Sequence, residues 1–346
     1  LMAEARRIWS DAAGLWLEGR SLSFGRHLSY WPFIQVLKDC FGIAEDDGEQ
    51  RSWVKLERGL QPLFGERTDE VLPYLATVLA LPIPAEHEER LKYLDGMGLR
   101  RQVFLCFRQL VELLAQRQPL VLVLEDWHWV DQSSVDLAEH LLPLTLNTPL
   151  LLVFPTREHA DGPLSRVRQF AAQHADARLD DVKLSPLTVQ HSTVLVNNLA
   201  GSLNLPLPLC EKILRKTEGN PFFMEEVIRS LVSDGVLVRD PEAGTWQLVR
   251  RVDEVLLPDT LQGLILSRID RLDEEAKQAL KLASVIGRSF FDRVLEAISE
   301  ARGQLRQCLS ELEQAELIRE RQRLPDLEYI FKHALVQDAA YGSILA

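Results

Sequence analysis

The chain has 346 residues, of which 46% are hydrophobic and 26% charged, the balance of a globular protein with two or three domains. Its net charge of −12 argues against bulk binding to a phosphate backbone, because like charges repel. No apolar run approaches the ~18 residues that cross a bilayer. The four scattered cysteines fit neither a disulfide framework nor a zinc site. We therefore expect a cytoplasmic protein that contacts no membrane.

The first third of the chain predicts mainly helices. Residues 1–13 have helical character without a capping residue, and residues 14–20 predict a short strand. Helices joined by turns are expected from there to about residue 85. An apolar period near 3.6 over residues 94–116 then predicts an amphipathic helix.

Two continuous apolar runs follow, at residues 120–124 and 149–156. Unbroken apolarity is typical of a strand buried on both faces of a parallel sheet. We expect a third short strand at residues 182–184, and Ser133 with Asp136 as the capping pair of the helix between the first two runs. Strands that alternate with helices predict an α/β fold with a doubly wound parallel sheet.

Beyond Pro186 the pattern becomes helical. Gly219 is expected to end one helix in a left-handed cap, and Asn220 and Pro221 to begin the next as N-cap and first helical residue. A small hairpin is predicted within residues 236–249.

The last segment predicts helices followed by a two-stranded wing, which indicates a winged helix. Three domains result: an α/β core at 1–186, a helical domain with the small hairpin at 187–257 and a winged helix at 258–346. The predicted elements are helices at 261–272, 274–286 and 305–317, strands at 318–321 and 327–331, and a final helix from near His333.

An acidic pair, Glu125 and Asp126, ends the first buried strand. Ligands of open α/β sheets bind at the carboxyl ends of the strands. Nucleotide hydrolysis needs one acid there to hold Mg²⁺ and a second group to orient or deprotonate water, so the pair matches the Walker B pattern. The alternative is a solvated strand end or a helix-capping acid, both of which are common.

Four further residues have both a functional and a structural interpretation. Arg157 follows the second buried strand, where a guanidinium can bind a terminal phosphate or simply pair with a surface acid. Asn220 and Pro221 can wall an adenine pocket or serve as ordinary helix punctuation. His333 can switch a domain contact near a phosphate or be a structural histidine.

The phosphate-binding motif G-x-x-x-x-G-K-[ST] does not occur in this sequence. Without that loop, phosphates lose the cradle of backbone N–H groups and its lysine.

Six segments together resemble the AAA-like ATPase module of STAND proteins, the signal-transduction ATPases with numerous domains. The closest subgroup is the module found next to class III adenylate/guanylate cyclases and in some Ser/Thr kinases and LuxR-type regulators. The resemblance spans nearly the whole chain in the right order. The segments are GRSLSFGRHLSYWPF, LVLEDWHWVDQSSVDL, LLLVFPTRE, KTEGNPFFMEEVIRSL, LPDTLQGLILSRIDRL and YIFKHALVQDAAYGSIL.

The resemblance implies a role for each matching residue. Glu125 would hold Mg²⁺ and Asp126 would be the catalytic acid, although the family more often has Asp at the first position. Arg157 matches the sensor arginine. The lid motif that contacts the nucleotide is matched by Gly219, Asn220 and Pro221, and His333 resembles the histidine that senses the bound diphosphate.

The same resemblance implies ATP or ADP with Mg²⁺ as cofactors. It also implies effector or sensor domains on the same chain (a cyclase, a kinase or a helix-turn-helix regulator, with C-terminal repeats) and self-association on activation. In the family the P-loop precedes a helix resembling residues 1–13. We therefore expect the chain to start just after that loop and, by itself, to bind ATP weakly or not at all.

Two other functions stay open. A scaffold that has lost its P-loop would only mediate protein contacts, and the sequence upstream of Leu1 separates this hypothesis from a nucleotide-driven switch. A DNA-binding regulator would use the helix at 305–317, but that helix carries Glu311, Glu313 and Glu316 against Arg306 alone. No direct contact with nucleic acid is therefore expected from this segment.

Overall fold

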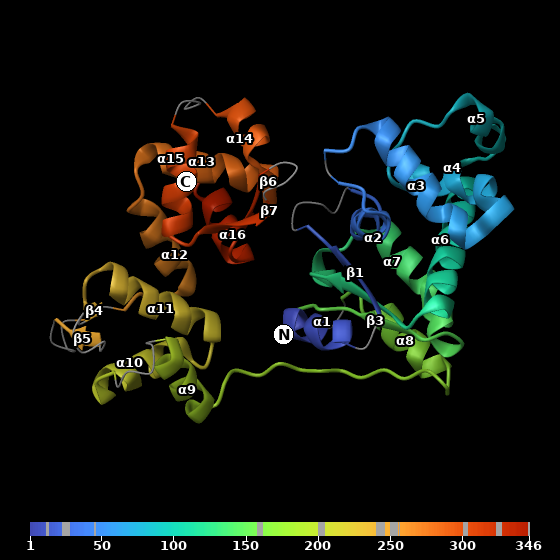
Figure 1. The fold of residues 1–346 in the computed structure, drawn as a ribbon. Helices are drawn as coiled ribbons and strands as arrows, with labels where there is room; N and C mark the ends of the chain where they lie inside the picture. Colours follow the sequence, from blue (N-terminus) through green and yellow to red (C-terminus); the bar gives the residue numbers. More distant parts are fainter. Residues whose placement is uncertain are drawn as a thin grey trace. The chain divides into compact units, whose positions relative to one another are not determined.

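The chain forms two compact units, residues Leu1–Asp181 and Val182–Ala346. Figure 1 follows both in a computed structural model. The structure describes residues 1–11, 14–22, 28–44, 46–157, 162–199, 205–239, 246–249, 255, 257–299, 304–322 and 327–344.

The first unit is built on a three-stranded parallel sheet in the order β1-β2-β3 (Leu15–Arg20, Leu120–Glu125 and Leu150–Val153). The central strand, β2, is buried on both faces, since residues 120–124 are at most 1% exposed. Both predicted strands are confirmed, and so is the α/β class with a parallel sheet. The second strand is not buried on both faces as predicted, because Leu151 of β3 is 54% exposed.

Helices surround this sheet. The longest is α6 (Gly96–Arg117), whose buried residues include Val103, Phe107 and Leu110, as the 3.6-residue period predicts. It shares one hydrophobic core with the sheet and with helices from before and after it. The other helices of the unit are α1 (Met2–Asp11), α2 (Trp31–Phe41), α3 (Glu49–Phe64), α4 (Thr68–Val78), α5 (Ala85–Lys92), α7 (Gln132–Leu141) and α8 (Ser165–Gln173).

Two local predictions are wrong. Residues 182–184 form no strand, and Val182 and Leu184 are 76% and 72% exposed, so this short apolar run has no sheet partner to bury it. The cap of α7 is Asp131, whose carboxylate accepts from the Ser134 N–H at 2.9 Å. Asp131 precedes the helix with extended backbone and is therefore placed to cap it, whereas Ser133 and Asp136 already lie within the helix.

The second unit begins with three helices and a hairpin. They are α9 (Val189–Leu199), α10 (Leu207–Thr217), α11 (Pro221–Ser233) and the antiparallel pair β4 (Leu237–Arg239) and β5 (Trp246–Leu248). The predicted hairpin is confirmed in its two strands, while the residues that join them lie outside the described part of the chain.

The rest of the second unit combines helices with a three-stranded antiparallel sheet in the order β6-β8-β7. The predicted helices and both predicted strands are present, but α14 and β6 were not expected from the sequence. The elements are α12 (Leu261–Asp270), α13 (Glu274–Ile286), β6 (Ser289–Phe291), α14 (Asp292–Ile298), α15 (Leu305–Gln314), β7 (Ile318–Gln322), β8 (Glu328–Phe331) and α16 (Ala334–Gly342).

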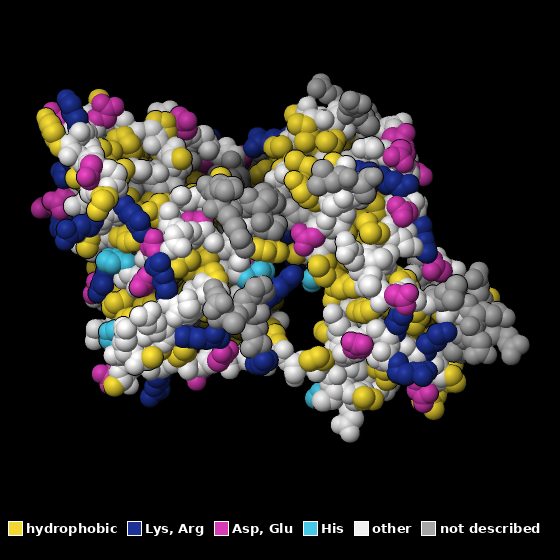
Figure 2. Space-filling view, turned by 180° about the vertical axis from the view of Figure 1, so that it is seen from behind, with side chains coloured by type: hydrophobic (Ala, Val, Ile, Leu, Met, Phe, Trp, Pro, Cys, Tyr) yellow, Lys and Arg dark blue, Asp and Glu magenta, His cyan; other side chains and the backbone are white. Residues whose placement is uncertain are grey.

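Charges of both signs lie on the surface. On the face shown in Figure 2, Lys and Arg side chains are interspersed with Asp and Glu side chains over each unit. Among the described residues, no helix is long and apolar enough to span a membrane.

Candidate functional site

The residues singled out in the sequence fall into two groups, one in each unit. Glu125, Asp126 and Arg157 belong to the first unit, and the Gly219–Pro221 motif and His333 belong to the second. Each group is described within its own unit.

The acidic pair sits where the central strand of the parallel sheet turns into the next segment. Glu125 is the last residue of β2, and Asp126 takes up left-handed backbone (φ 54°, ψ 38°). That conformation costs a non-glycine residue roughly 1–2 kcal/mol. The turn is held by two backbone bonds, from the Trp127 N–H to the Pro155 carbonyl at 3.0 Å and from the Trp129 N–H to the Asp126 carbonyl at 2.9 Å. A strained acid is thus fixed at the carboxyl end of the sheet.

Arg20, which sequence analysis missed as a site residue, contacts both acids. It ends β1 directly opposite Glu125 in the strand register. Its Nη2 donates to Glu125 Oε2, and its Nε lies 3.5 Å from Asp126 Oδ2. The signal was present in the sequence, because parallel strands that end together bring their last side chains to one edge. The register of the two strands, which places Arg20 opposite Glu125, could not be read from the sequence.

Neighbouring contacts fix the end of β1. Gly19 lies so close to α2 that a Cβ there would meet the Pro32 carbonyl oxygen at 2.0 Å, so only glycine fits. The Arg20 N–H donates to Gln35 Oε1 at 2.8 Å, and the Ser21 N–H donates to the Glu125 carbonyl at 2.9 Å. The backbone that presents Arg20 is therefore anchored to α2 on one side and to β2 on the other.

Arg157 lies beside the turn that follows Asp126. Its guanidinium is 5.6 Å from the Trp129 ring centroid in a cation–π contact, and the residue is exposed. The bond from Trp127 to Pro155 brings the segment after β3 against this same turn. The structure thus brings Arg157 to the neighbourhood of the acidic pair, as the parallel sheet predicts.

Asp131 ties the loop before α2 to α7. One carboxylate oxygen accepts from the Tyr30 N–H at 3.3 Å and from the Ser134 N–H at 2.9 Å, and the other accepts from the Ser134 hydroxyl at 2.6 Å. The residue is 5% exposed, so its charge is satisfied inside the protein. Asp131 therefore has a structural role: it holds the start of α7 and the residue before α2 together.

The two carboxylates at this edge of the sheet are ligands of the kind that Mg²⁺ binds. Within the described residues, no group of three or more His, Cys, Asp or Glu side chains could hold a metal ion. Mg²⁺ commonly uses only one or two carboxylates together with waters and substrate phosphates. Glu125 and Asp126 supply that number, and one cationic group, the Arg20 guanidinium, already lies against both. The residues therefore fit a nucleotide-bound Mg²⁺.

The Gly219–Pro221 motif follows α10, whose left-handed cap is Glu218 (φ 49°) rather than Gly219 as predicted, while Asn220 and Pro221 begin α11 as expected from the sequence. Asn220 is its N-cap, and its side chain accepts from the Phe223 N–H at 3.1 Å. Gly219 has φ +78°, and its carbonyl accepts from the Leu187 N–H at 2.9 Å. A Cβ on Gly219 would meet the Leu187 carbonyl oxygen at 2.5 Å, so the close approach requires glycine.

His333 lies against the same helix start. Its ring stacks on Phe222, the second residue of α11, with ring centroids 3.8 Å apart and an interplanar angle of 15°. Its Nδ1 accepts from the Leu335 N–H at 3.2 Å and so caps α16. The Gly219–Pro221 motif and His333, both predicted as nucleotide contacts, are thereby connected through Phe222, which directly follows Pro221.

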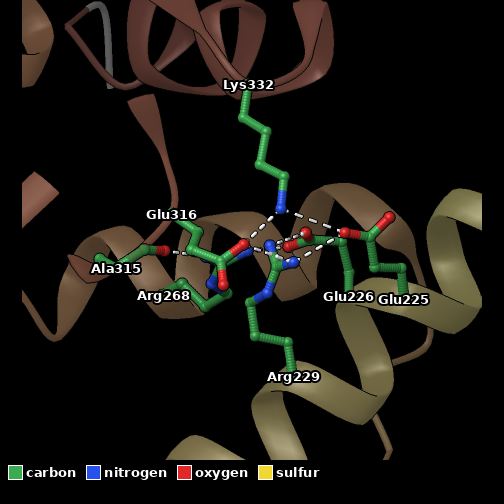
Figure 3. A network of polar contacts seen from close by, with 7 residues as sticks. All are labelled: Glu225, Glu226, Arg229, Arg268, Ala315, Glu316 and Lys332. Atoms are coloured by element: carbon green, nitrogen blue, oxygen red, sulfur yellow. Dashed lines mark hydrogen bonds and ion pairs between the residues drawn. The ribbon is translucent and has the colours of Figure 1, made fainter. Parts of the chain in front are cut away.

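A charged network ties α11 to the elements around His333 (Figure 3). Glu226, 1% exposed, is paired with Arg268 of α12 and with Arg229 at 3.0 Å. Arg268 also donates to the Ala315 carbonyl. Glu316, which follows α15, pairs with Arg229 at 2.7 Å and with Lys332.

The same network reaches Lys332, the residue next to His333, through two ion pairs. Glu225 pairs with Arg229 at 2.7 Å and with Lys332, the neighbour of His333, at 3.2 Å. Burial alone would raise the pKa of Glu316, but the hydrogen bond from Lys332 and the charges of Arg229, Lys332 and Arg268 outweigh it and lower that pKa. Three carboxylates and three cations thus balance where α11, α12 and the β8–α16 turn meet.

Comparison with known proteins gives a family match and two curated relatives. Residues 1–153 match the model of the AAA ATPase domain. An uncharacterized protein of Rhizobium meliloti (strain 1021) is 24% identical over 257 residues, covering 72% of this chain and 23% of that protein. The hybrid signal transduction histidine kinase G of Dictyostelium discoideum is 27% identical over 130 residues, 37% of this chain and 4% of that one. The chain thus spans less than a quarter of either relative.

Two solved structures are also similar. One is a signal transduction ATPase with numerous domains (STAND) protein with a tetratricopeptide repeat sensor from Pyrococcus horikoshii (TM-score 0.44, 11% identity, 94% of this chain and 40% of that one). The other is a RuvB variant from Thermotoga maritima (TM-score 0.27, 17% identity, 64% and 70%). The match over residues 1–153 supports the AAA-like ATPase part of the module recognised in the sequence.

Proposed function

We propose that this chain is the ATP-binding switch module of a multidomain signalling protein. Exchange of ADP for ATP would change the activity or self-association of domains attached to it. The observation that carries the proposal is the edge of the parallel sheet. There, Glu125 and Asp126 lie together with Arg20 within the part matched to the AAA ATPase domain, and Arg157, which follows that part, lies against the same turn.

In this proposal the acidic pair does the chemistry of the Walker B pattern. Glu125 would hold Mg²⁺, which would neutralise phosphate charge, and Asp126 would orient or deprotonate the attacking water. Arg157 binds the terminal phosphate through its guanidinium. Its present contact is with a tryptophan face, so the guanidinium can reach a phosphate without breaking a buried ion pair.

The second unit supplies the lid and the sensing part of the proposal. The motif Gly219–Pro221 and the winged-helix histidine, His333, would contact the nucleotide. Phe222 stacks on His333. A charged network also extends from α11 to Lys332, the residue before His333; it consists of Glu225, Glu226, Arg229, Arg268, Glu316 and Lys332. A nucleotide that moves the start of α11 would therefore also move His333, which is the property that a switch needs.

Nucleotide binding and hydrolysis by two variants test this proposal. Fluorescent ADP binding and ATP turnover are measured on the full-length product of the gene that encodes this chain. Asp126→Asn should lower turnover by about 10²–10⁴-fold and keep ADP affinity, because a general base is lost. Glu125→Gln should remove the Mg²⁺ dependence of nucleotide binding.

The contrary outcome favours a different function. Nucleotide affinity that is absent in the unaltered protein, or identical in the presence and absence of Mg²⁺ for all three proteins, would leave a protein-interaction scaffold as the better account.

A further inference from the structure

Arg20 is the one cation among the described residues whose guanidinium spans both acids of the pair. Its Nη2 donates to Glu125 Oε2, while its Nε lies 3.5 Å from Asp126 Oδ2. The Arg20 Nε atom is buried and makes no hydrogen bond within the described part of the chain. The guanidinium is therefore held by charge between two carboxylates rather than by a full set of hydrogen bonds.

The backbone at Arg20 cannot follow a departing side chain. It is fixed by the parallel register with β2, by the bond to Gln35 and by the contact of Gly19 with Pro32. The side chain itself is 34% exposed, so its end has a route to water through side-chain rotation alone. This combination fits a group that swings away from the acids while the sheet stays intact.

The electrostatics favour a resident cation at this edge. Consecutive carboxylates, 18% and 32% exposed, repel one another unless a positive charge lies between them. A divalent ion carries twice the charge of a guanidinium and competes for the same oxygens. The arginine and a metal ion would therefore compete for the Glu125 carboxylate.

We propose that Arg20 is a displaceable counter-ion of the acidic pair, which holds Glu125 and Asp126 in the metal-free state and must release Glu125 before a divalent cation binds. The proposal rests on the metal role proposed above for Glu125. It makes Arg20 a positioning residue that sets how strongly the site attracts the metal, rather than a group that touches the reacting atoms.

Mn²⁺ binding tests the proposal without any turnover, because free Mn²⁺ is counted directly by its electron paramagnetic resonance signal. Arg20→Gln should bind Mn²⁺ about five-fold more tightly than the unaltered chain, the factor that corresponds to an ion pair of about 1 kcal/mol. Arg67→Gln removes the same charge from an exposed pair in the same unit and should leave Mn²⁺ affinity unchanged.

Two further variants secure the result. Arg20→Lys keeps the charge but loses the planar fork that spans two carboxylates, so it should fall between the unaltered chain and Arg20→Gln, and it decides the question if the glutamine variant does not fold. The double variant Arg20→Gln with Glu125→Gln should not show the increase in Mn²⁺ affinity that Arg20→Gln alone produces.

The outcomes separate the two proposals. Arg20 variants that bind Mn²⁺ no more tightly, while Glu125→Gln weakens binding, would overturn the counter-ion role and leave the metal role of Glu125 intact. Mn²⁺ binding that Glu125→Gln does not change would overturn both.

Discussion

Gly219 shows how much a single residue of the lid motif is constrained. Its φ of +78° is unfavourable for other residues, and its missing side chain leaves room for the Leu187 backbone. Gly219→Ala should destabilise the protein by at least about 3 kcal/mol, because left-handed strain adds to a clash with backbone atoms. Urea unfolding measures the change.

A second glycine in the same unit is the matched control. Gly235 has φ +63°, but a Cβ there would meet nothing within 4 Å. Gly235→Ala should therefore cost only about 1 kcal/mol. Equal losses for the two variants would show that the close approach to Leu187 contributes nothing to stability.

At the scale of elements, the buried pair of Glu226 and Arg268 joins α11 to α12. Arg268→Met should cost about 3 kcal/mol, because Glu226 is 1% exposed and would keep only Arg229 as its partner. Arg271→Met removes an exposed pair with Asp234 and should cost less than about 1 kcal/mol. Chemical unfolding of both variants is the measurement, and similar losses would refute the buried pair as a tie between the helices.

The same network predicts a dependence on pH through Glu316. Its pKa is lowered from the ordinary value of 4.5 in the folded protein, so the carboxylate stabilises the fold above pH 4.5. That contribution is lost as the pH falls through the lowered pKa. Thermal unfolding should show Glu316→Gln less stable than the unaltered protein near neutral pH, with the gap closing below pH 4.5. A gap that stays constant down to pH 3 would contradict the pairing.

Elements with a strong local signal were predictable, and contacts between distant elements were not. The buried strand before Glu125 and the start of α11 at Asn220 and Pro221 follow from apolar runs and capping residues. The pairing of Arg20 with Glu125 depends on strand register, and the stacking of Phe222 on His333 depends on tertiary packing. Neither leaves a periodic trace in the sequence.

At the scale of the whole molecule, the candidate residues are divided between two compact units. The first carries the acidic pair with Arg20, and the second carries the Gly219–Pro221 motif with His333. The proposed switch assigns nucleotide contacts to both groups, and it depends on both groups responding to the same ligand.

Hydrogen–deuterium exchange with and without Mg²⁺ and ADP tests that claim most directly. The measurement uses the full-length product of the gene that encodes this chain. We predict slower exchange on nucleotide addition in two separate segments, residues 120–131 and residues 218–224. Unchanged exchange in residues 120–131, or protection confined to the first unit, would contradict a nucleotide switch that uses both.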